Sequence, residues 1–207
     1  MKPHEIEKES FKIIDQEAGE HGFPPDQWSI VRRMIHTTAD FDYIHTVRFH
    51  PEAIQAGIKA IMQGKNIITD TEMGRVGVRK ADLEPFGTRV MCFMNDPSVF
   101  ELSEQMEITR AAAAVDHAIP FIEDGIYVIG NAPTALFRVL ELMDQGLARP
   151  ALVVGLPVGF VNAAQSKAAL MKTRRPFISN VGRKGGSNVA ASVVNALIKL
   201  VLEQGES

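Results

Sequence analysis

The sequence predicts an α/β fold, a mostly parallel sheet covered by helices on both faces, with an N-terminal helical segment before it. Two observations support this prediction. Short apolar runs that favour buried strands alternate with longer segments of helical periodicity. The runs are almost continuously apolar instead of alternating with polar residues, which is typical of parallel strands buried on both faces.

Five strands are expected, and each is bounded by turn residues. They are NIITD at 66–70, RVMCFM at 89–94, YVIGN at 127–131, ALVVGLPVG at 151–159 and PFISN at 176–180. Helices are expected at 26–37, 97–119, 133–146, 160–173 and 186–205. The alternation of strand and helix favours crossover connections, which leave neighbouring strands parallel.

The 207 residues are expected to form a single domain, with a mainly helical N-terminal segment at 1–64 and an α/β core at 65–207. A net charge of −3 and a pI near 6.1 argue against nucleic acid as a partner. The charged N-terminus does not resemble a signal peptide, the apolar runs are too short to cross a membrane, and Cys92 has no cysteine to pair with. We therefore expect a soluble, cytoplasmic protein that does not bind membranes.

Polar residues follow the expected strands, at the edge where open parallel sheets bind ligands. Asn95 and Asp96 stand before a proline that begins a helix, so helix capping is the simpler interpretation for them. Asn131 stands in a similar place, and for this residue capping and ligand binding are equally open.

The segment GRKGGSN at 182–188 precedes the last helix and places Arg183, Lys184 and Gly185 beside a helix N-terminus. Such a loop can cradle an anion with its backbone N–H groups and cations. The alternative is a flexible loop with solvated charges. Three more cations follow the first strand, and together they suggest a small polyanionic ligand: Arg75, Arg79 and Lys80.

His36 falls in the last turn of the helix expected at 26–37. The helix C-terminus stabilises an imidazolium, so His36 is placed to hold and deliver a proton, although capping the last carbonyls is the more ordinary role for a histidine here. The spacing of His36, His45 and His50 matches no familiar metal motif, so no metal site is predicted. His117 is interpreted as a packed helix residue and Cys92 as an unreactive buried thiol.

Six colinear motifs resemble the precorrin-8X methylmutase family over nearly the whole chain. They are IHTTAD at 35–40, ITDTEMGRVGV at 68–78, TRAAAAVD at 109–116, GNAPTAL at 130–136, VGLPVGFVNAAQSK at 154–167 and SNVGRKGGSNVAASVVNAL at 179–197. One departure is Gln165, where the family pattern more often has Glu.

The resemblance implies an isomerase of cobalamin biosynthesis that moves a methyl group from carbon 11 to carbon 12 of a tetrapyrrole. It implies that His36 is the catalytic proton donor and acceptor, and that Ser10 and Arg110 contact substrate, Arg110 across a homodimer interface. The substrate is a flat apolar ring fringed by carboxylates, which Asn131 and the 183–185 loop are expected to meet. No cofactor is expected, because any cobalt belongs to the substrate.

Two other functions are compatible with parts of this pattern. A phosphate-binding or nucleotide-binding enzyme would share the fold, but TEMGRVGV at 71–78 is not the glycine-rich first loop that such enzymes need. A non-catalytic tetrapyrrole carrier would use the same apolar slot and the same cations, and it stays open as the alternative.

Overall fold

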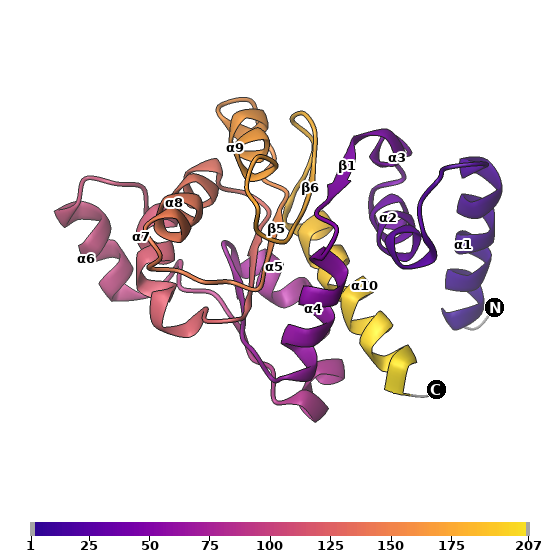
Figure 1. Cartoon of the computed structure of the whole chain (residues 1–207), viewed down its shortest axis with the longest axis horizontal. Coiled ribbons are helices and arrows are strands. Elements are labelled where there is room, and N and C mark those ends of the chain that lie inside the picture. Colours follow the sequence, from indigo (N-terminus) through magenta and orange to yellow (C-terminus); the bar gives the residue numbers. More distant parts are fainter. Residues whose placement is uncertain (1–2, 206–207) are drawn as a thin grey trace.

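The computed structural model describes residues 3–205, and its centre is a six-stranded sheet in the order β1-β6-β5-β4-β2-β3 (Figure 1). The strands are β1 Val47–Phe49, β2 Ile67–Thr69, β3 Val90–Met91, β4 Ile126–Ile129, β5 Leu152–Gly155 and β6 Phe177–Asn180. β2 to β6 pair in parallel, and β1 pairs antiparallel with β6 at one edge. The predicted α/β class with a mostly parallel sheet is confirmed.

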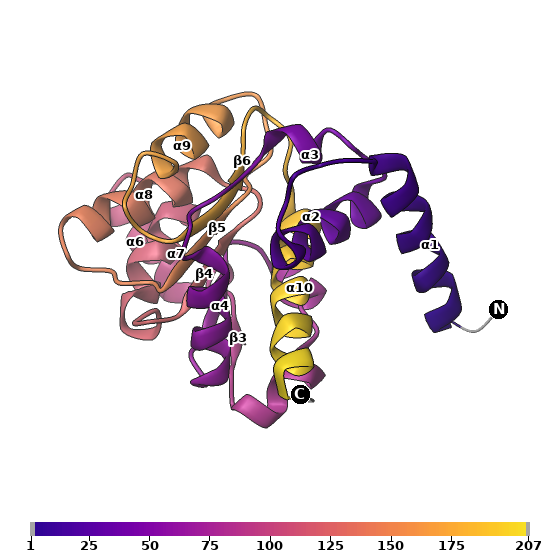
Figure 2. The ribbon, with the colours of Figure 1, turned by 45° about the vertical axis from the view of Figure 1, so that its right-hand side comes forward.

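Helices cover both faces of the sheet, as predicted (Figures 1 and 2). The α-helices are α1 Pro3–Ala18, α2 Pro25–Thr38, α3 Tyr43–Thr46, α4 Ala53–Met62, α5 Glu72–Gly77, α6 Pro97–Gln105, α7 Arg110–Ala118, α8 Pro133–Asp144, α9 Ala163–Leu170 and α10 Ser187–Gly205. Two 3₁₀ turns complete the described part of the chain, η1 Lys80–Phe86 and η2 Ile119–Phe121.

Alternate residues of the central strands point to opposite faces and enter two separate cores. Ile126 and Leu152 lie in the core that contains α2, α4 and α10. Tyr127 and Val153, the next residue of each strand, lie in the core that contains α7, α8 and α9. Both sets are buried, which explains why these strands read as continuous apolar runs instead of alternating ones.

The N-terminal helices form an additional layer beyond α10. α2 packs along α10, and α1 lies outside α2 (Figure 2). The helix expected at 26–37 is therefore confirmed almost to the residue, since α2 is Pro25–Thr38. It ends at Ala39, which takes a left-handed conformation with φ of 52° and donates its N–H to the Ile35 carbonyl at 2.7 Å.

β1 was not predicted, and it lies inside the segment expected to be mainly helical. Its three residues, VRF, include one buried side chain, Val47, so no strand pattern could appear. The strand forms because its backbone pairs with β6, where Val47 stands opposite Asn180. The pairing attaches the N-terminal segment to the edge of the sheet. The boundaries predicted for a single domain stay a prediction.

The helix expected at 97–119 is instead two helices, α6 and α7. Between them Glu107 takes a positive φ of 53°, which a continuous helix does not permit. Thr109 then caps α7, because its hydroxyl accepts the Ala112 N–H at 3.2 Å. The prediction of one helix was wrong because the apolar periodicity runs on through the break.

Candidate functional site

His36 and Ser10 line the same cavity between α1 and α2, with a volume of about 330 Å³. His36 is exposed in the last turn of α2, as expected, and Phe11 meets its ring edge-on at 5.3 Å between centroids. Apolar side chains form much of the remaining lining: Ile13, Ile14, Ile35 and Phe41. The cavity thus joins a titratable ring, a hydroxyl and an apolar wall.

Charged side chains also meet where α1 packs against α2. Arg33 donates to Glu7 at 2.6 Å, and this hydrogen bond is the main cause that lowers the pKa of Glu7. Lys199 and His36 lie close enough to lower it further by Coulomb attraction. The Glu7 carboxylate therefore lies close to the helix end that carries His36.

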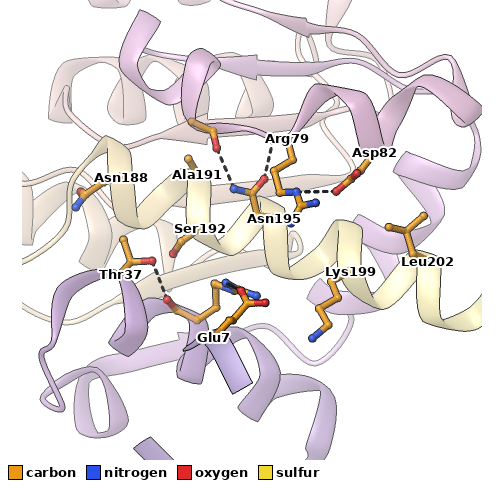
Figure 3. Close-up of a pocket in the computed structure, with 12 residues that line it drawn as sticks. Glu7, Thr37, Arg79, Asp82, Asn188, Ala191, Ser192, Asn195, Lys199 and Leu202 are labelled. Atoms are coloured by element: carbon orange, nitrogen blue, oxygen red, sulfur yellow. Dashed lines mark hydrogen bonds and ion pairs between the residues drawn. The ribbon is translucent and has the colours of Figure 1, made fainter. Parts of the chain in front are cut away.

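A second cavity, of about 490 Å³, lies beside α10, and Thr37, the residue after His36, is part of its lining (Figure 3). Its charges are largely paired with one another. Arg79 contacts Asp82 at 2.8 Å, and Asn195 accepts the Arg79 N–H while its amide donates to the Gly77 carbonyl. These contacts tie the segment after α5 to α10, so we assign the cavity a structural role.

The strand-end turn that contains Asn131 is held by a buried carboxylate that the sequence analysis did not single out. Asp70, 4% exposed, accepts N–H groups from Gly130, Asn131 and Ala132 at 2.8–2.9 Å. Burial raises the pKa of Asp70, and these hydrogen bonds oppose the rise. Asn131 is exposed and does not cap α8, whose N-cap is Ala132, so its side chain is available at this edge.

Asp96 behaves as the capping interpretation predicts. Its carboxylate accepts the backbone N–H of Ser98 at 3.0 Å at the start of α6. His117 contacts the hydroxyl of Ser98 at 3.1 Å and packs against Phe93, so its predicted role as a packed helix residue fits its surroundings.

The three residues of the predicted anion cradle have different surroundings. Arg183 is exposed and lies over the ring of Phe160 at 5.4 Å. Lys184 is engaged with two carboxylates, Asp40 and Asp42, at 2.6 Å each. The backbone of Gly185 packs so closely under the Leu156 carbonyl that any side chain would collide with it, and this contact explains the glycine.

A buried lysine that was not predicted as a site residue also holds the backbone of this loop. Lys167 is 0% exposed and donates to the Asn180 side chain at 3.0 Å and to the Lys184 carbonyl at 2.6 Å. Burial lowers its pKa to about 8. No ion pair joins Lys167 to any carboxylate among residues 5–205.

Arg110 does not share the His36 cavity. It begins α7 and lies over the Phe100 ring at 4.7 Å, and α7 is on the opposite side of the molecule from α1 and α2 (Figures 1 and 2). The cations expected after the first strand also divide: Arg75 pairs with Glu72 and Arg79 with Asp82, so two of the three are neutralised. Arg75 lies in α5 and Arg79 at the N-cap of η1, so neither is in an open loop.

Among residues 5–205, no three His, Cys, Asp or Glu side chains lie close enough together to hold a metal ion. Nor is any helix in that range long and apolar enough to span a membrane.

Comparison with known proteins identifies the family. The family model for precorrin-8X methylmutase (CbiC) matches residues 5–200. A cobalt-precorrin-8 methylmutase of Priestia megaterium is 46% identical over 95% of this chain and 88% of its own, and a precorrin-8X methylmutase of Pseudomonas aeruginosa is 42% identical over 93% of each chain.

A crystal structure of precorrin-8X methylmutase from Thermus thermophilus superposes with a TM-score of 0.91 at 46% identity, covering 98% of both chains. These matches extend across the sheet, the α1–α2 cavity and the strand-end loops together. The chain belongs to the precorrin-8X methylmutase family, isomerases of cobalamin biosynthesis that act on a tetrapyrrole.

Proposed function

We propose that this protein moves a methyl group from carbon 11 to carbon 12 of the tetrapyrrole, converting precorrin-8X to hydrogenobyrinate or cobalt-precorrin-8 to cobyrinate. The observation that carries the proposal is the cavity in which His36 and Ser10 lie together on an apolar wall. The named relatives support it, since they include methylmutases for the metal-free and the cobalt-containing substrate.

In this reaction the methyl–carbon 11 bond breaks and the methyl–carbon 12 bond forms, with the electrons supplied by the conjugated ring. The protein therefore needs to fix the ring conformation and to exchange one proton with it. Apolar residues of the cavity hold the ring face, and the His36 imidazole donates and later recovers the proton. Ser10 would hydrogen-bond a carboxylate of the ring periphery by turning its hydroxyl proton to the substrate from the Ile6 carbonyl, which accepts it at 2.9 Å in this structure.

The cavity is small for a whole tetrapyrrole, so we propose that a second copy of the chain completes the site. Arg110, far from His36 within one chain, would then approach the substrate from the partner. Asn131 and Arg183 would meet the ring carboxylates. We further propose that the protein is cytoplasmic and uses no cofactor, any cobalt entering as part of the substrate; a chain with one cysteine suits a reducing compartment.

The test is conversion of the chromophore. Purified protein is mixed with precorrin-8X, and in parallel with cobalt-precorrin-8, and visible spectra are followed with time. The enzyme changes the conjugation of the ring, so the absorbance shifts at a rate proportional to protein. A carrier binds the ring without converting it, and extraction returning unchanged substrate would favour that alternative.

A further inference from the structure

The ammonium of Lys184 is paired with carboxylates of the protein itself, which an anion-binding lysine would not be expected to be. Its ammonium lies 2.6 Å from the carboxylates of both Asp40 and Asp42, more than 140 residues earlier in the chain. These hydrogen bonds lower the pKa of Asp42 and raise the pKa of Lys184. Two carboxylates already exceed the charge of one ammonium, so the side chain offers little net attraction to a substrate carboxylate.

The two carboxylates belong to the turn that ends the His36 helix. Asp40 follows Ala39, the C-cap of α2, and its carboxylate accepts the backbone N–H of Asp42 at 3.0 Å. His36 is one helical turn before Asp40. Order in this turn therefore bears on the position of the His36 imidazole.

The backbone of Lys184 is held firmly by the core. Its carbonyl accepts from Lys167 at 2.6 Å and from the Asn180 amide at 3.0 Å, and both donor residues are 0% exposed. The next residue, Gly185, packs against Leu156. Lys184 thus joins a backbone segment fixed at the sheet edge to the C-terminal turn of α2.

We propose that Lys184 is a positioning residue, which holds the C-terminal turn of α2 and the His36 imidazole in place against the carboxyl edge of the sheet. Arg183 has no ion pair with any residue of the range 5–205, so we propose it as the cation that meets the substrate. Exposed ion pairs add little to global stability, so the effect of this contact is local order. This positioning role depends on the proposed function only because that function gives His36 its catalytic role.

Amide hydrogen exchange tests the contact without any substrate. In Lys184→Met, exchange at residues 37–39 should rise about tenfold or more, because local opening sets exchange at helix ends. Lys172→Met is the matched control, since Lys172 is an exposed lysine at the end of α9, and it should leave these amides unchanged. Lys184→Arg should preserve most of the protection.

Removing the lysine also leaves two carboxylates to repel each other, and a neutral variant separates this effect. The triple variant Asp40→Asn, Asp42→Asn, Lys184→Met has neither the repulsion nor the link, and its exchange should stay elevated. Wild-type protection in the triple variant, or in Lys184→Met, would overturn the proposal.

Kinetics then show what the contact does for catalysis. Lys184→Met should lower kcat about tenfold and leave KM within twofold, and it should have no further effect once Asp40 and Asp42 are both Asn. A substrate-binding lysine would instead raise KM in either background. If the wild type converts no substrate, the proposed function fails, while the exchange result still decides whether Lys184 orders the turn.

Discussion

Lys167 is a fully buried lysine whose ammonium has only neutral hydrogen-bond acceptors, the Asn180 side chain and the Lys184 carbonyl. Burial lowers its pKa to about 8 from 10.5, so between these values the unfolded chain binds a proton that the folded chain has released. The free energy of unfolding must then rise with pH in this window.

We expect the wild type to gain about 1 kcal/mol relative to Lys167→Met between pH 8.5 and 9.5. The comparison with Lys167→Met, by urea denaturation at each pH, cancels the other groups that titrate there. Parallel pH dependences for the two proteins would mean that Lys167 keeps its ordinary pKa.

Ser10 is expected to act on substrate binding and not on the fold. Its hydroxyl faces the His36 cavity from an exposed helix, so Ser10→Ala should change stability by less than about 0.5 kcal/mol. Loss of one neutral hydrogen bond should weaken substrate binding roughly 2–10-fold. Titration of the ring chromophore measures the affinity, and an unchanged Kd would remove Ser10 from the site.

Some residues could be assigned from sequence and others could not, for a physical reason. His36 was found because a helix end and a motif both mark it. Asp70 and Lys167 could not be assigned in this way. A charged residue after a strand or on a helix is normally solvated, and these two are buried only by the packing of segments that are distant in sequence. Lys184 was assigned to anion binding because its aspartate partners are remote in sequence.

At the scale of elements, Asp70 connects the end of β2 to the turn between β4 and α8. Asp70→Ala would leave three N–H donors without their acceptor, and we expect a loss of roughly 2–4 kcal/mol in the free energy of unfolding. Asp144→Ala, at an exposed position on α8, is the control and should change stability by less than about 0.5 kcal/mol. Equal urea midpoints for the two variants would contradict this role.

Helices and strands could be predicted where the local pattern of apolar residues determines them. Continuous apolar runs identified β2 to β6, since β2, β4, β5 and β6 are buried on both faces and β3, at the sheet edge, is half-buried. β1 was not predicted because it forms only by pairing with β6, which is remote in sequence. α6 and α7 were predicted as one helix because the positive φ of Glu107, which separates them, leaves no mark in the apolar pattern.

At the scale of the whole molecule, we expect a symmetric homodimer with His36 of one chain and Arg110 of the other in each site. Light scattering should give twice the chain mass of 22.7 kDa at micromolar concentration. Mixed subunits offer a sharper test. His36→Ala and Arg110→Ala, each weak alone, should recover about a quarter of wild-type activity after subunit exchange, since hybrids regain one native site.

No recovery, in mixtures shown to contain hybrid dimers, would place both residues in the same chain's site or remove Arg110 from it. A mass of one chain would exclude the shared site altogether.

The most direct measurement of the central claim, that this protein performs the methyl shift through His36, is single-turnover conversion of bound substrate. His36 is exposed, so His36→Ala should fold and bind the ring nearly as the wild type does. Loss of the proton donor should slow conversion about 10²–10⁴-fold, and His36→Asn, which cannot transfer a proton, should be equally slow. Near-normal turnover in His36→Ala, with substrate binding intact, would contradict the account.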